Sequence, residues 1–156
     1  MGCVPFQSVH YLDGSAQDIT AECQRYTALL RQFPVDIVCM GIGENGHIAF
    51  NDPHTALFRD PAAVKPVTLD LTCRNQQVHD GCFSSTDEVP TQAITLTIPS
   101  LFAGRYLFCI VPGKAKAAAV KNTVEGMVSE ACPASILRRH PNACLLYTSD
   151  AADDSL

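Results

Sequence analysis

Two short apolar runs constrain the fold of this 156-residue chain more than any other feature. They lie within residues 36–40 and 106–111, and each is followed by a loop that contains glycine. Both runs are too short for a buried helix and are apolar on both faces, which is typical of central strands in a parallel sheet. Such sheets bind ligands at the carboxyl ends of their strands. We therefore expect a binding site in the loops that follow these two runs.

Helical and strand patterns fill the rest of the chain. Apolar residues recur at helical intervals from Ile19 to Phe33, after the capping-box spacing of Ser15–Asp18, and Pro34 ends this helix. Residues 92–98 alternate apolar side chains with threonines, which is typical of a half-buried strand. Weaker patterns predict further short strands and helices at residues 6–12, 64–69, 70–78, 99–104, 114–124, 133–139 and 143–147. Strands that alternate with helices predict an α/β fold with a parallel sheet flanked by helices.

Charge and hydropathy exclude several classes of function. A net charge of −5 argues against binding to nucleic acid or to an anionic membrane surface, because both need a basic patch. No apolar run reaches the ~18 residues of a membrane span, and the first twenty residues lack the apolar core of a signal peptide. We therefore expect a cytoplasmic protein.

The eight cysteines do not form a metal-binding pattern. No C-x2-C pair occurs, and Cys39 and Cys109 lie inside apolar runs. Reduced cysteines in such positions act as small hydrophobic residues. We expect neither a zinc site nor a disulfide scaffold.

The loop after the first apolar run is the densest in unusual residues. Gly41-Ile-Gly-Glu-Asn-Gly46 is a G-x-G-x-x-G sequence after a strand, the pattern of a dinucleotide-binding loop. That pattern requires a helix to begin at the third glycine, whereas Asn51-Asp-Pro53 follows five residues later and disfavours a helix. We therefore reject dinucleotide binding. The glycines still let the backbone adopt positive φ and approach a ligand closely.

His47 and Asp52 are the candidate catalytic residues of this loop. Histidine is the usual general acid/base of proteins, and this one would stand at the carboxyl end of the strand. If the segment forms a turn, His47 and Asp52 can converge as an acid/base pair. The alternative is a buried, hydrogen-bonded histidine followed by a simple Asn-Asp-Pro turn, and the residues alone leave both interpretations open.

Residues 41–53, Gly-Ile-Gly-Glu-Asn-Gly-His-Ile-Ala-Phe-Asn-Asp-Pro, resemble the signature of the glucosamine-6-phosphate deaminases, or isomerases. The resemblance extends from about Tyr11 to Ala143. It includes residues 89–90, 113–116, 125–126 and 140–141. The related 6-phosphogluconolactonases share the Gly-x-Asp/Asn-Gly-His part, but the longer match favours the deaminase branch.

The resemblance implies a fold, a reaction and a set of site residues. The fold would be a Rossmann-like parallel sheet flanked by helices. The reaction would convert glucosamine 6-phosphate to fructose 6-phosphate and ammonia in amino-sugar catabolism, without metal or organic cofactor. His47 would open the sugar ring, Asp52 would assist it, and residue 45 would orient it. The glycines Gly41, Gly43 and Gly46 would line the substrate site. Members of the family often form homo-oligomers, so a homo-oligomer is one expected form.

Several positions depart from the family pattern. Asn45 stands where an orienting aspartate is usual, with Glu44 as a neighbouring substitute, and Asp52 is shorter than the usual glutamate. A phosphate-binding arginine expected shortly before Phe83 is absent, and Arg74 is the candidate replacement. By the same resemblance Lys116 binds the substrate phosphate, whereas we expect Lys114 to be solvated.

The two ends of the sequence also differ from the family. The family's first strands, with a phosphate loop and a proton-shuttling aspartate, would precede residue 1. We therefore expect a carboxyl-terminal fragment that lacks the N-terminal strands, and the resemblance leaves open whether this fragment is active alone. Residues 1–147 would form the partial domain, and residues 148–156, which are small, acidic and aperiodic, would be a non-native disordered tail.

Two other functions remain open at this stage. One is a non-catalytic sugar-phosphate sensor, since related folds serve as effector domains of transcriptional regulators, and Asn45 and the absent arginine motivate it. The other keeps an enzyme of the same class that hydrolyses a lactone or isomerises another sugar phosphate.

Overall fold

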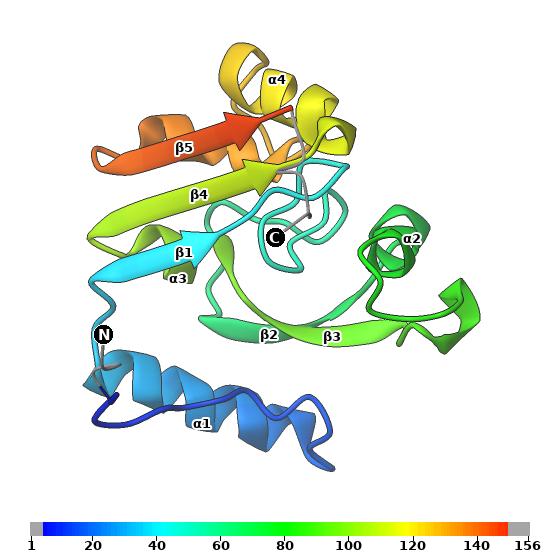
Figure 1. Cartoon of the computed structure of the whole chain (residues 1–156). Coiled ribbons are helices and arrows are strands. Elements are labelled where there is room, and N and C mark those ends of the chain that lie inside the picture. Colours follow the sequence, from blue (N-terminus) through cyan, green and yellow to red (C-terminus); the bar gives the residue numbers. More distant parts are fainter. Residues whose placement is uncertain (1–4, 150–156) are drawn as a thin grey trace.

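A computed structural model of the chain describes residues 5–149. Its central feature is a parallel sheet of three strands in the order β1-β4-β5 (Figure 1). β1 (Ile37–Met40) pairs with β4 (Tyr106–Pro112), and β4 pairs with β5 (Ala143–Thr148). The two apolar runs therefore form neighbouring parallel strands, as predicted. The prediction that both are central is wrong for β1, which lies at an edge of the sheet within residues 5–149.

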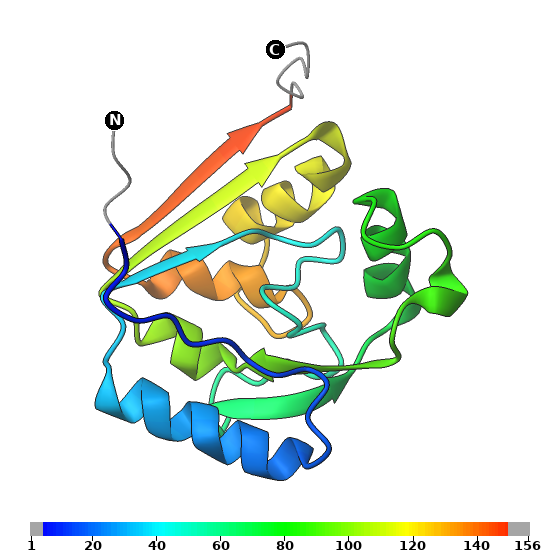
Figure 2. The same cartoon turned by 60° about the horizontal axis from the view of Figure 1, so that its bottom comes forward.

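The main core lies on one face of this sheet. Leu107, Cys109 and Val111 of β4 are almost fully buried there. They pack against the helix α4 (Ala117–Glu125) and the 3₁₀ helix η3 (Pro133–Arg139), which Figure 2 shows on the same side of the strands. Burial raises the pKa of the Cys109 thiol to about 12, so this cysteine acts as a hydrophobic core residue.

The opposite face of the sheet is open. The side chains that alternate with the core residues are 38–57% exposed. They are Ile37, Tyr106, Phe108, Ile110 and Leu146. The two apolar runs predict burial on both faces, and this prediction is wrong within residues 5–149, because no element described there covers the second face. The cross-strand register aligns these side chains in one continuous apolar surface.

A separate antiparallel pair of strands lies beside the sheet. β2 (Val64–Thr68) pairs with β3 (Gln92–Leu96), and neither joins the parallel sheet. The alternation of strands and helices predicted a parallel sheet, and this pair departs from it. β2 has one neighbour only, which agrees with the predicted edge position and with Pro66, because proline cannot donate a ladder hydrogen bond.

The first helix, α1 (Ile19–Gln32), lies alongside this pair and not on the parallel sheet (Figure 1). Its N-cap is Asp18, whose carboxylate accepts from the Ala21 amide at 2.9 Å. The predicted capping box at Ser15 does not form, because the Ser15 amide instead donates to the Asp13 carboxylate.

The remaining elements connect these units. They are α2 (Leu71–His79), the 3₁₀ helices η1 (Thr86–Glu88) and η2 (Lys114–Lys116), and α3 (Ile98–Phe102). Residues 6–12 form an extended entry without strand pairing. Thr148, which the sequence assigned to the tail, is the last residue of β5, and the rest of the predicted tail from residue 150 lies outside the described residues. Among residues 5–149, no helix has the length and apolar character needed to span a bilayer.

We expect a leucine-to-alanine substitution to lower the free energy of unfolding by different amounts on the two faces of the sheet. Leu107→Ala should lower the free energy of unfolding by about 2–5 kcal/mol, because it leaves a cavity in the core. Leu146→Ala is the matched control on the open face, where the change should stay within about 0.5–1 kcal/mol. Urea unfolding followed by circular dichroism measures both, and equal losses would show that the second face is covered in solution.

Candidate active site

The loop after β1 forms a series of turns and contains no helix between residues 41 and 53. The Gly43 amide donates to the His47 carbonyl, and the Gly46 amide donates to the Gly43 carbonyl, each at 2.9 Å. The side-chain amide of Asn51 donates to the Leu96 carbonyl at 2.8 Å and so holds the loop against β3. This geometry supports the rejection of a dinucleotide-binding helix, and it turns the His47 side chain back toward Asp52.

Two glycines are needed for this shape. Gly46 has φ of +84°, a conformation that residues with a Cβ rarely adopt. Gly43 lies under the imidazole of His47, where an added Cβ would be 2.1 Å from Cε1 of the ring. The sequence predicted that the glycines allow close approach of a ligand. At Gly43 the close approach is made by the catalytic candidate itself.

His47, Asn45 and Asp52 form one hydrogen-bonded group. Nδ1 of His47 lies 2.8 Å from Oδ1 of Asn45 and 3.0 Å from Oδ1 of Asp52. Nδ2 of Asn45 donates to the same Asp52 oxygen at 3.0 Å. The structure therefore brings together the three residues predicted to be catalytic. Both His47 and Asp52 are buried.

The contacts of Nδ1 set the tautomer of the imidazole. Two oxygen acceptors face this nitrogen, so it carries the proton and donates it. Nε2, on the opposite side of the ring, is left with a free lone pair. A neutral His47 in this tautomer can accept a proton at Nε2, and the Asp52 carboxylate can stabilise the imidazolium that results.

Asp52 remains charged although it is fully buried. Burial raises the pKa of this carboxyl, but the hydrogen bonds from His47 and Asn45 outweigh burial and hold the pKa below its usual value. A depressed pKa means that the stabilisation is present above the pKa of the unfolded chain, about 3.9, and is lost as the pH falls through the lower folded value. The carboxylate is therefore available as a fixed negative charge at neutral pH.

The imidazole lines a cleft of about 390 Å³. Gly41 and Gly43 form part of its wall, and Phe50, Gln76 and Thr95 contribute from other segments. Asn45 and Asp52 do not line the cleft, so they act on a ligand there through His47. A cleft of this size matches a small-molecule site.

Lys116 reaches the same end of the sheet from the loop after β4. Its Nζ lies 3.9 Å from a carboxylate oxygen of Glu44, which is beyond hydrogen-bonding distance. This ammonium is buried and has no hydrogen-bond partner among residues 5–149. A buried ammonium whose nearest carboxylate is too far to accept a hydrogen bond is costly unless a second anion joins it. Lys114, in contrast, is exposed, as predicted.

Arg74 has a different environment. Its guanidinium donates to the backbone carbonyls of Thr86 and Val89, at 2.6 and 3.1 Å, and it does not line the cleft. These contacts hold the segment around η1 against α2. They give no support to Arg74 as the replacement for the phosphate-binding arginine.

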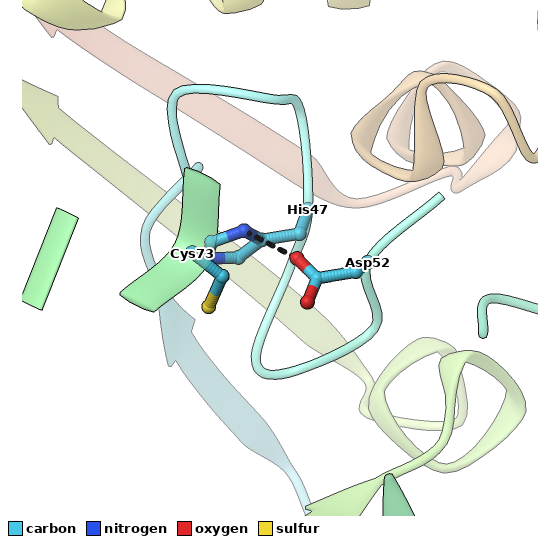
Figure 3. A group of neighbouring side chains, drawn as sticks. All are labelled: His47, Asp52 and Cys73. Atoms are coloured by element: carbon cyan, nitrogen blue, oxygen red, sulfur yellow. Dashed lines mark ion pairs between the residues drawn. The ribbon is translucent and has the colours of Figure 1, made fainter. Parts of the chain in front are cut away.

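The described residues also include a buried group of metal-ligand types. Ligand atoms of His47, Asp52 and Cys73 lie within 4.8 Å of one another (Figure 3), and a second such group joins Asp52 with His54 and Asp70. Burial, together with the nearby charges of Asp52 and Asp70, raises the pKa of the Cys73 thiol to about 12. A thiol that stays protonated at neutral pH is a poor metal ligand.

Some residues of the site were not predicted from the sequence. Asp70 accepts a hydrogen bond from Nδ2 of Asn45 at 3.1 Å, and Gln76 accepts one from the Glu44 amide at 3.0 Å. The only signal for Asp70 was an aspartate at the expected start of a helix. Nothing in the local spacing shows that this helix, α2, begins behind His47.

The fold and the site together define a Rossmann-like α/β protein with a histidine–carboxylate site at the carboxyl ends of parallel strands. Residues 2–146 match the family of glucosamine-6-phosphate isomerases and 6-phosphogluconolactonases. The chain belongs to this family.

Relatives and solved structures agree with this assignment. The chain is 39% identical to the glucosamine-6-phosphate deaminases of Bacillus thuringiensis and Bacillus anthracis, over 95% of its own length and 55% of theirs. It is similar to a solved monomeric glucosamine-6-phosphate deaminase with a TM-score of 0.80 and 36% identity, covering 87% of this chain and 55% of that one. The 6-phosphogluconolactonase of Thermotoga maritima shares the fold, with a TM-score of 0.67 and 21% identity, covering 94% and 58%. The chain thus spans about half the length of the curated relatives it matches.

The contact between Gly43 and His47 generates a prediction. Gly43→Ala should displace the imidazole from its two acceptors, because the new Cβ would overlap the ring. We expect a lower melting temperature and a changed His47 signal in ¹H–¹⁵N NMR spectra. Gly14→Ala is the matched control, since a Cβ there meets no atom within 4 Å. An unchanged His47 signal in the Gly43 variant would contradict the geometry described.

Proposed function

We propose that the protein converts glucosamine 6-phosphate and water to fructose 6-phosphate and ammonia. The observation that carries the proposal is the buried group of His47, Asn45 and Asp52, which leaves Nε2 of the imidazole free beside a cleft. The match to deaminases over 95% of the chain supports the choice of substrate.

The first step assigned to this chain is opening of the sugar ring. Nε2 of His47 takes the proton of the C1 hydroxyl, the C1–O5 bond breaks as the aldehyde forms, and the same proton is returned to O5. Asp52 is charged and hydrogen-bonded to Nδ1, so it stabilises the imidazolium while the proton resides there. Asn45 holds Nδ1–H in place and leaves the charge to the carboxylate.

The later steps need a second base. Transfer of the C2 proton to C1 converts the amino aldehyde to a ketimine, and water hydrolyses the imine to a ketone with release of ammonia. The family resemblance gives the proton transfer to an aspartate that would precede residue 1. The proposal therefore assigns ring opening to residues 41–53 and leaves the C2 base to that aspartate.

Lys116 is the proposed ligand of the substrate phosphate. Its ammonium is buried, has no hydrogen-bond partner in the described part of the chain and lies 3.9 Å from the Glu44 carboxylate. A phosphate would accept from this ammonium, because charge-assisted hydrogen bonds are strong where water is excluded. Arg74 remains a predicted phosphate ligand without support from its contacts.

The cellular location and the oligomeric state of the protein are also proposals. The seven cysteines among the described residues are free, which is typical of a reducing compartment and supports a cytoplasmic location. A role in N-acetylglucosamine catabolism follows from the proposed substrate. The homo-oligomer stays a prediction, and a monomeric deaminase is among the similar structures.

His47→Ala tests the reaction directly. When the segment that supplies the C2 base is present, ammonia release from glucosamine 6-phosphate should fall by roughly 10²–10⁴-fold, the usual contribution of general acid–base catalysis. His10→Ala is the control, because His10 is exposed and stacks on Phe33 away from the cleft. Full activity of the His47 variant, or release of 6-phosphogluconate from its lactone in place of ammonia, would reject the proposal.

Lys116→Met tests phosphate recognition. The KM for glucosamine 6-phosphate should rise about 10- to 100-fold, since hydrogen bonds to charged groups contribute about 1.5–3 kcal/mol. Lys114→Met should leave KM unchanged, because Lys114 is exposed. Inorganic phosphate should protect the original protein, but not the Lys116 variant, against thermal unfolding, and equal protection would remove Lys116 from the site.

A further inference from the structure

Asp70 lies behind the His47 group and makes contacts there that helix capping does not require. It is the N-cap of α2, and its Oδ1 accepts from the Cys73 amide at 2.7 Å. Its other oxygen accepts from Nδ2 of Asn45 at 3.1 Å. Its backbone amide also faces Oδ2 of Asp52 at 3.4 Å. Capping a helix requires only the first of these contacts.

The contact with Asn45 fixes the direction of the amide group. An amide nitrogen has two hydrogens, and here one goes to Asp52 and the other to Asp70. The amide oxygen is thereby directed at the backbone amide and Nδ1 of His47. If the amide were flipped, its oxygen would face two carboxylates and its nitrogen would face the imidazole proton. Both arrangements are repulsive, so Asp70 and Asp52 together select the observed one.

Asp70 also adds negative charge to a group in which Asn45 carries none. The charged and titratable groups that face His47 are Asp52 directly and Asp70 through the Asn45 amide. The Cys73 thiol is protonated, and Glu44 is shared between Lys116 and His79 at 3.9 and 3.7 Å. A cation formed at His47 therefore meets two carboxylates joined by one amide.

We propose that Asp70 is a positioning residue for His47, acting through the Asn45 amide. It holds the amide oxygen on Nδ1, fixes the Nδ1–H tautomer and leaves Nε2 as the base. It also supplies charge that Asn45 lacks. The link to turnover rests on the proposed deaminase function, whereas the effect on the tautomer does not.

Asp70→Asn separates these roles from helix capping. Asparagine caps a helix about as well as aspartate, so α2 should remain as stable as before. The negative charge at position 70 is lost, and so is the preferred orientation of the Asn45 side-chain amide. In the ¹⁵N-histidine-labelled protein, the His47 signals should move from the Nδ1–H tautomer to a mixture of both tautomers. Asp70→Ser, which also caps, should give the same change. Asp18→Asn is the matched control, since Asp18 caps α1 in the same way without contacting the site.

Turnover supplies the second readout. In Asp70→Asn we expect kcat to fall about tenfold with little change in KM, and the acidic limb of the pH–rate profile to move to lower pH. A tenfold fall corresponds to about 1.4 kcal/mol of transition-state stabilisation. If the protein that includes the segment with the C2 base releases no ammonia, the proposed function fails, and the tautomer still tests the role of Asp70. A His47 tautomer that is unchanged in both Asp70 variants overturns the inference.

Discussion

The imidazole of His47 is held between one amide and one buried carboxylate, and the rest of the site depends on this arrangement. Nδ1 faces Asn45 and Asp52, while the other side of the ring is left for a ligand. β1 carries the loop to the carboxyl end of the sheet, and Gly43 gives the ring room. The role of His47 is thus set by the shape of a twelve-residue turn, and the sheet only places it.

The site contains two buried charges, the Asp52 carboxylate and the Lys116 ammonium, whose surroundings differ. Asp52 stays ionised although it is buried, because the hydrogen bonds that His47 and Asn45 donate lower its pKa by more than burial raises it. Lys116 shows the opposite situation, since its buried ammonium lacks a hydrogen-bonding anion. One half of the site is therefore internally satisfied and suits proton transfer, while the other half has a buried ammonium that suits binding of an anionic group.

Local sequence information was most useful where the interacting residues are close in the chain. Residues 45, 47 and 52 lie in one loop, so the glycines and Pro53 indicated a turn in which they can converge, and a simple structural turn fitted the same residues. Asp70 was missed because it reaches Asn45 across 25 positions, a contact that depends on how α2 is placed by the β2–β3 pair. The apolar pattern of β1 correctly indicated a parallel strand. The pattern could not show that β1 lies at an edge of the sheet or that one face of the sheet is exposed. Apolar side chains show that a strand can be buried, but they do not show which strands and helices pack against it.

The open face of the β1-β4-β5 sheet lowers the stability and the solubility expected of this chain. Each large apolar side chain left in water forgoes part of the roughly 1.5–3 kcal/mol that full burial provides, and several such side chains lie together there. Native proteins are stable by only about 5–15 kcal/mol, so this shortfall is a large fraction of the total. A contiguous apolar surface next to an unpaired edge strand also favours aggregation at high concentration. We therefore expect this surface to lower the yield and the shelf life of the purified chain.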